Sequence, residues 1–180
     1  MTTSPLSPNH PICLLATWFG VGEYKKAPGT LASLAALPFA YGIQTFFGGQ
    51  GLLIATFIAF LGGAWICDQY MQRNNIPHDA PEIVIDEIAG QWLILLAFPA
   101  TLQGYLLAFI LFRFFDILKP WPINLIDAKA KGGTGVMLDD FAAGLIPGML
   151  FALLTLALMV SGHNDWVVAV YDLLGGNGIF

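Results

Sequence analysis

The 180-residue chain has a net charge of −5 at pH 7, with 57% hydrophobic residues and only 11% charged residues. Soluble domains carry roughly 25% charged residues and could not bury so much apolar surface, so the composition excludes an ordinary soluble protein. We therefore expect an integral membrane protein forming one domain over residues 1–180. We expect no nucleic-acid partner, and the sequence leaves the oligomeric state open.

The residues that precede the first predicted spanning helix are expected to lie outside the bilayer or at its surface. Residues 1–11 are rich in proline and polar residues and are expected to be loose. Residues 12–21 are apolar but shorter than the roughly 20 residues that cross a bilayer, so they should lie at the interface with Trp18 as an anchor. Thr30 is the expected N-cap of the first spanning helix, and Gly29 before it lets the backbone approach closely.

Apolar runs then predict an all-α, polytopic helical bundle with about five spanning helices and short interfacial helices. The expected spans are 30–47, 51–67, about 81–98, 102–118 and about 136–160. A tight Gly-Gly-Gln turn joins the first two, and a polar connector at 123–135 precedes the last. Residues 161–180 form a non-cytoplasmic tail with a short apolar piece at 166–174.

The basic residues are distributed asymmetrically over this predicted topology. With five spans, the N-terminus and the loops at 68–82 and 119–135 share one side of the membrane. All seven Lys and Arg residues lie on or close to that side. The positive-inside rule makes it the cytoplasmic side.

Two acidic pairs, Asp86–Glu87 and Asp139–Asp140, lie near the starts of apolar helices, the first pair in the second turn of its helix. One acid per helix would complement the helix dipole, but two adjacent pairs exceed that need and favour a functional site. Carboxylate oxygens suit Mg²⁺. Asp86 and Asp140 both begin the pattern D-x-x-A-G, whose small residues would let a second helix or a ligand come close.

A third group of charges lies near the end of the fourth predicted helix. Asp116 is disfavoured by the dipole there, and a salt bridge to Arg113 or Lys119, both three residues away, is compatible with a catalytic role. Arg113 lies among phenylalanines, which favours a phosphate contact or an internal ion pair over simple anchoring. Lys119 fits either a site role or a membrane anchor.

Several enzyme signatures are absent from the sequence. There is no G-x-S-x-G, H-E-x-x-H or P-loop, and no Cys/His metal spacing. Four stretches instead resemble the phosphatidylglycerophosphatase A family of bacterial inner-membrane lipid phosphatases, in its order and spacing: APGTLASLAALP (27–38), HDAPEIVIDEIAGQW (78–92), FRFFDILKPWPI (112–123) and GGTGVMLDDFAAG (132–144). Ala32 departs from the pattern, where glycine is expected.

The resemblance implies Mg²⁺-dependent hydrolysis of phosphatidylglycerophosphate to phosphatidylglycerol and phosphate, on a phospholipid substrate at the cytoplasmic face of the inner membrane. As a hypothesis, the metal would be held by Asp86, Glu87, Asp139 and Asp140. The substrate phosphate would be held by Thr30, Arg113 and Lys119. The expected catalytic residues are Asp86, Asp116 and Asp140. Direct attack by water and an aspartyl-phosphate intermediate both remain open.

A small cation- or proton-coupled membrane transporter is the alternative, because carboxylates inside apolar helices also form ion pathways. The acids gather at one face of the predicted bundle instead of lining a path across it, which favours the enzyme.

Overall fold

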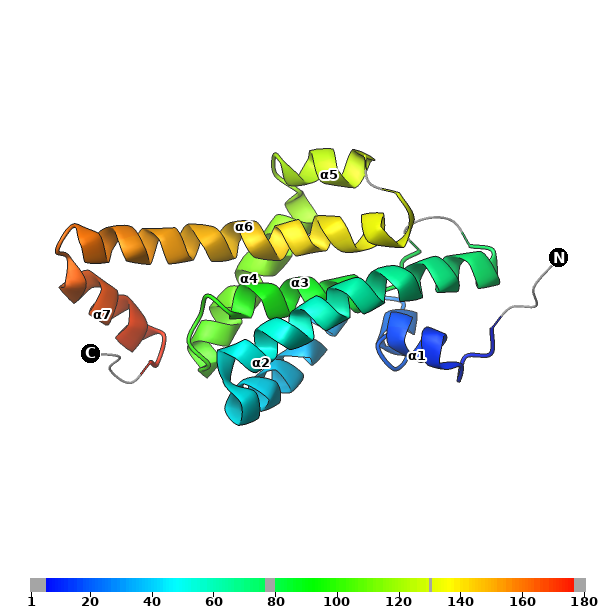
Figure 1. The fold of residues 1–180 in the computed structure, drawn as a ribbon, viewed down its shortest axis with the longest axis horizontal. Helices are drawn as coiled ribbons and strands as arrows, with labels where there is room; N and C mark the ends of the chain where they lie inside the picture. Colours follow the sequence, from blue (N-terminus) through cyan, green and yellow to red (C-terminus); the bar gives the residue numbers. More distant parts are fainter. Residues whose placement is uncertain (1–5, 77–79, 130, 177–180) are drawn as a thin grey trace.

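The computed structural model describes residues 6–76, 80–129 and 131–176, and within them it contains helices and no strand (Figure 1). The predicted all-α class is therefore confirmed. The helices are α1 (Pro11–Ala16), the 3-10 helix η1 (Val21–Glu23), α2 (Pro28–Asn74), α3 (Ile85–Leu95), α4 (Leu102–Leu118), α5 (Ile123–Lys129), α6 (Gly132–Val160) and α7 (Asn164–Leu173). Parts of the predicted loose N-terminus (1–5) and of the predicted 68–82 loop (77–79) lie outside the described residues.

The helix α2 consists of two helices that form a hairpin, visible in Figure 1 where α2 turns back on itself. Gly48 interrupts it with φ 68° and ψ −174°, a conformation that glycine adopts without the usual steric cost. The predicted pair of helices joined by a glycine turn is confirmed. The second helix runs beyond Cys67 to Asn74, because residues 68–74 contain no glycine or proline and the chain leaves the helix only at the left-handed Asn75.

The start of α2 differs from the prediction for Thr30. The helix begins at Pro28, with Ala27 as its N-cap residue, so Thr30 lies inside the first turn and does not cap it. Proline is favoured at the first helical position because its missing N–H would have no helical partner there.

The short helix α3 lies at the centre of the bundle and contacts α2, α4 and α6. It spans only 11 residues, and nine of them are buried. The prediction of a third helix over 81–98 was therefore wrong, and Asp86 and Glu87 lie in the first turn of α3 instead of the second. The helix starts late because the backbone N–H of Val84 donates a 2.9 Å hydrogen bond to the carbonyl of Ala16, which holds the preceding chain in a non-helical conformation.

Among the described helices, α2 and α6 are long and apolar enough to cross a membrane by length and composition. The helix α3 rises only about 16 Å, roughly half of the hydrocarbon thickness of a bilayer. The helix α4 has 17 residues. Five spanning helices are therefore not confirmed. The exterior is nevertheless strongly apolar, with side chains such as Phe46, Leu153 and Val160 more than half exposed.

The N-terminal apolar segment also differs from the prediction. The helix α1 covers only Pro11–Ala16, and Trp18 is 8% exposed. The Trp18 ring packs edge-on against Trp92 of α3, with ring centroids 6.0 Å apart. Trp18 is therefore a core residue, and its prediction as an interfacial anchor was wrong because tertiary packing buries it.

The polar connector predicted at 123–135 is largely helical. It contains α5, and α6 begins at Gly132 instead of about residue 136. The Asp68 carboxylate accepts a 2.5 Å hydrogen bond from the Gly133 N–H and so satisfies one free donor at the start of α6. The carbonyl of Ala64 occupies the space that a Cβ on Gly133 would need, so glycine permits α6 to start against α2.

Candidate active site

The two D-x-x-A-G patterns meet at the crossing of α3 and α6. A Cβ on Gly144 would collide with the carbonyl of Gly90, and a Cβ on Gly90 would collide with the carbonyl of Asp140. The glycines therefore allow the two backbones to touch, as the sequence predicted. Because Asp86 and Asp140 each lie one turn before their glycine, this contact brings the two aspartates together.

Three carboxylates lie close together beside this helix crossing. Asp86, Glu87 and Asp140 each offer an oxygen, and the three oxygens lie within 4.8 Å of one another. Asp86 and Asp140 are buried, at 7% and 4% exposure. Negative charges so close together in a buried site repel strongly unless a cation or a proton lies among them. The arrangement therefore favours binding of a positive ion.

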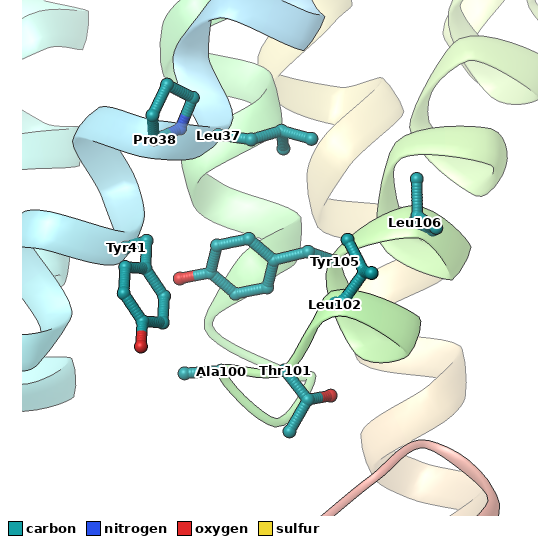
Figure 2. A pocket seen from close by; sticks show the side chains of 8 residues that line it. All are labelled: Leu37, Pro38, Tyr41, Ala100, Thr101, Leu102, Tyr105 and Leu106. Atoms are coloured by element: carbon teal, nitrogen blue, oxygen red, sulfur yellow. The ribbon is translucent and has the colours of Figure 1, made fainter.

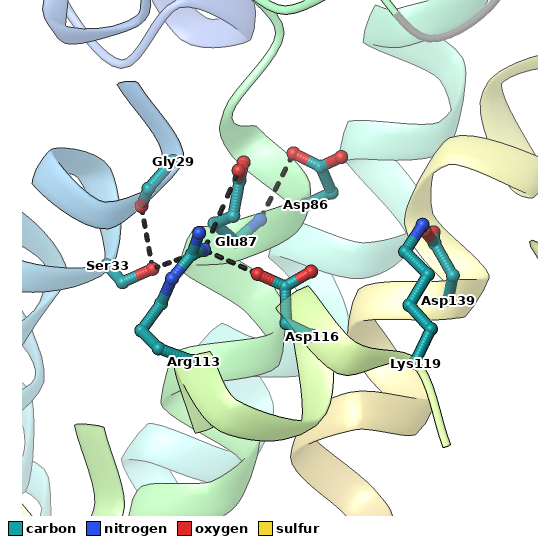
Figure 3. Close-up of polar contacts among 8 residues, drawn as sticks. All are labelled: Gly29, Ser33, Asp86, Glu87, Arg113, Asp116, Lys119 and Asp139. Atoms are coloured by element: carbon teal, nitrogen blue, oxygen red, sulfur yellow. Dashed lines mark hydrogen bonds and ion pairs between the residues drawn. The ribbon is translucent and has the colours of Figure 1, made fainter. Parts of the chain in front are cut away.

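An arginine on α4 lies beside Glu87, one of the three carboxylates (Figure 3). Arg113 Nη1 is 2.5 Å from Asp116 Oδ2 and 3.9 Å from Glu87 Oε1. The predicted salt bridge between Arg113 and Asp116 is confirmed. The guanidinium has five donors and cannot lose its charge, so it can contact a bound phosphate while retaining Asp116.

The start of α2 forms another wall of this site. A Cβ on Gly29 would collide with the Glu87 carboxylate, which confirms the predicted close approach at Gly29. Ser33 Oγ donates a 2.8 Å hydrogen bond to the Gly29 carbonyl and accepts one of 3.4 Å from Arg113 Nη1. The sequence analysis missed Ser33, although it lies one helical turn after Gly29 on the same face.

Two other predicted site residues, Asp139 and Lys119, form a separate group (Figure 3), and Thr30 lies in the first turn of α2, close in sequence to Gly29. Lys119 Nζ lies 2.7 Å from Asp139 Oδ2 and 2.5 Å from Asp127 Oδ1. Burial acts to lower the pKa of Lys119, but the hydrogen bonds to both carboxylates outweigh it and raise the pKa, so the ammonium stays charged. The pairing joins the end of α4 to α5 and α6, and the sequence analysis did not foresee Asp127 as a partner.

Replacing Lys119 with Met is expected to lower the free energy of unfolding by about 1–3 kcal/mol, because it leaves Asp139 largely buried without its counter-charge. Thermal unfolding in detergent measures the change. The double variant Lys119→Met/Asp139→Asn should recover part of the loss, because the largely buried side chain at 139 is then neutral and only the exposed Asp127 carboxylate lacks its partner. Equal stability of Lys119→Met and the unmodified protein would contradict the structural role of this pair.

A pocket of about 390 Å³ lies at the N-terminal end of α4, away from Lys119 (Figure 2). Its walls are formed by Leu37, Pro38, Tyr41, Ala100, Thr101, Leu102, Tyr105 and Leu106. This lining contains no carboxylate and no basic side chain, so the pocket offers neither a metal ligand nor a cation for phosphate. The candidate active site is therefore the acid cluster beside Arg113.

The fold and the site together define a class: an all-helical protein in which acidic side chains from separate helices meet beside an arginine, an arrangement suited to phosphate chemistry. A family model described as Phosphatidylglycerophosphatase A matches residues 14–155. The chain belongs to this family of lipid phosphatases, which confirms the resemblance found in the sequence.

Two of three similar proteins carry the name of this family. A protein of Escherichia coli K12 named Phosphatidylglycerophosphatase A is 39% identical over 150 residues, which cover 82% of this chain and 86% of the relative. A protein of Haemophilus influenzae with the same name is 42% identical, over 76% of this chain and 83% of the relative. A Bacteroides thetaiotaomicron protein, named as a candidate phosphatidylinositol-3-phosphatase, is 34% identical over 77% of this chain and 90% of the relative. No solved structure matches the chain.

Proposed function

We propose that this protein hydrolyses the terminal phosphate of phosphatidylglycerophosphate to give phosphatidylglycerol and phosphate. The observation that carries the proposal is the convergence of three carboxylates beside Arg113 in a protein that belongs to this family. The names of the Escherichia coli and Haemophilus influenzae relatives supply the substrate. Neither the comparisons nor the acid cluster at one end of the bundle supports the transporter alternative.

Mg²⁺ fits the donor set of the site. Asp86, Glu87 and Asp140 provide only carboxylate oxygens, the hard ligands that Mg²⁺ takes together with substrate phosphate. Asp139 would act through the adjacent Asp140 or through water, because its carboxylate already binds Lys119. When bound, the ion supplies positive charge that stabilises the phosphoryl group.

The side chains around the acids then have distinct roles. Arg113 and the first turn of α2 at Thr30 bind phosphate oxygens. Lys119 has three N–H donors and uses two on carboxylates, so one is left for a phosphate oxygen. Asp116 accepts a proton from the attacking water, whose oxygen bonds to phosphorus as the bond to the glycerol oxygen breaks. The same proton then passes from Asp116 to the glycerol oxygen, which leaves as the hydroxyl of phosphatidylglycerol.

The site would lie at the cytoplasmic face of the inner membrane in a multi-pass protein. We propose that both halves of α2, together with α4 and α6, cross the bilayer around the buried α3. All the Lys and Arg residues then lie at or close to the end of the bundle that holds the acids, as the positive-inside rule requires for the cytoplasmic end. A phospholipid would keep its acyl chains in the bilayer while its headgroup reaches the acids.

Purified protein in mixed micelles is expected to release phosphate from phosphatidylglycerophosphate in the presence of Mg²⁺ and to lose most of this activity in excess EDTA. Recovery of phosphate release on adding Mg²⁺ would show that EDTA inhibits the enzyme by removing the metal ion. Phosphatidylinositol 3-phosphate and phosphatidate serve as comparison substrates, and ion flux is measured in proteoliposomes. No phosphate release, or flux without hydrolysis, would contradict the proposed function.

A further inference from the structure

Gln91 is a fully buried polar residue that the proposed mechanism does not use. It is 0% exposed, yet neither its Oε1 nor its Nε2 has a hydrogen-bond partner among the described residues. Burying a carboxamide without hydrogen-bond partners destabilises the folded state. An apolar side chain of the same size would avoid this cost, so the carboxamide requires a functional explanation.

The position of Gln91 connects it with the candidate active site. It lies four residues after Glu87, so both side chains project from the same face of α3. Five buried side-chain polar atoms lack a partner in the described part of the chain, and four of them belong to Gln91, Glu87 and Arg113. Glu87 and Arg113 are themselves in contact at 3.9 Å. The unsatisfied groups are therefore concentrated at the edge of the acid cluster.

These four atoms complement one another chemically. Arg113 Nε and Gln91 Nε2 are donors, whereas Glu87 Oε2 and Gln91 Oε1 are acceptors. A hydroxyl-bearing ligand both donates and accepts, so one such group can serve both kinds of atom. A second metal ion or a phosphate would suit only the acceptors or only the donors.

We propose that Gln91 is a hydroxyl-binding residue of the active site, which, with Glu87 and Arg113, holds either a water molecule or the free hydroxyl of the substrate headgroup. The inference rests on the proposed function. In the first case Gln91 is a positioning residue that fixes Glu87 and Arg113 through the water. In the second case it recognises the glycerol between the two phosphates of the substrate.

The test compares two substitutions with opposite effects on stability. Gln91→Met removes the carboxamide but keeps the length of the side chain, whereas Gln91→Asn keeps the carboxamide and loses a methylene. We expect Gln91→Met to be at least as stable as the unmodified protein and to lose about tenfold or more in kcat. Gln91→Asn should be less stable but more active than Gln91→Met. Leu95→Met, one turn further along the same buried face, is the matched control and should leave turnover unchanged.

The source of the hydroxyl is identified with a substrate whose headgroup lacks it. If the substrate hydroxyl binds Gln91, Gln91→Met should lose activity on the natural headgroup but little on the deoxy headgroup. If water binds there, the loss should be equal on both substrates. Full activity of Gln91→Met would overturn the proposal. So would a set of variants in which turnover falls only where the free energy of unfolding falls. Failure of the unmodified protein to hydrolyse the substrate would instead contradict the proposed function.

Discussion

Replacing Asp140 with Asn is expected to lower phosphate release about 10²–10⁴-fold while making the metal-free protein more stable. The loss follows because Asn removes one of three carboxylates that the proposed mechanism needs, within the usual range for a single catalytic group. The gain in stability follows because Asp140, Asp86 and Glu87 repel one another within 4.8 Å when no cation is bound. A gain of about 1 kcal/mol would raise Tm by roughly 2–4 °C for a chain of this size.

Metal binding provides a separate measurement of the same change. Mg²⁺ should raise the Tm of the unmodified protein, because a ligand that binds only the folded state stabilises it. The Asp140→Asn variant should show a much smaller rise. Asp165→Asn, which removes an exposed carboxylate on α7, is the matched control and should alter neither activity nor the response to Mg²⁺. Normal turnover of Asp140→Asn would remove this residue from the active site.

Replacing Gly144 with Ala is expected to abolish most activity by separating α3 from α6. The added Cβ would collide with the backbone carbonyl of Gly90, and a backbone atom cannot move aside as a flexible side chain can. The helices must therefore move apart, which separates Asp86 from Asp140. We expect a loss of about 1–3 kcal/mol in unfolding free energy, typical of overpacking a tight core, and at least about 100-fold in turnover.

The control for Gly144→Ala lies one turn along the same helix. A Cβ on Gly148 would meet its nearest atoms, in Ile94 and Ala97, at 3.6–3.7 Å, which is ordinary contact. Gly148→Ala should therefore keep full activity and stabilise the helix by about 0.5–1 kcal/mol, the usual gain from replacing a helical glycine. Equal behaviour of the two variants in activity and Tm would show that the helix crossing does not position the acids.

Much of this organisation could be predicted because it depends on local chemistry. The apolar runs and the prolines and glycines between them predicted an all-helical chain, and Gly48 reverses α2 where the Gly-Gly-Gln turn was expected. The repeated D-x-x-A-G pattern indicated a close helix contact beside Asp86 and Asp140. Charged residues in apolar helices are costly, so their positions in the sequence were enough to indicate the region of the candidate site.

Other features could not be predicted because they depend on contacts between segments far apart in the chain. The start of α3 is set by a hydrogen bond from Val84 to Ala16, and Trp18 is buried by Trp92. Ser33 joined the site only when α2 packed beside Arg113. No periodicity within one segment encodes such contacts.

The amino-acid sequence by itself determined a helical, strongly apolar chain, its family, and the acids that we propose carry its chemistry. Only the tertiary structure decided which of the adjacent acids on α6 joins the cluster. Asp139 and Asp140 project about 100° apart around the helix, so they cannot both face α3. Packing directs Asp140 toward Asp86 and Glu87 and leaves Asp139 to bind Lys119.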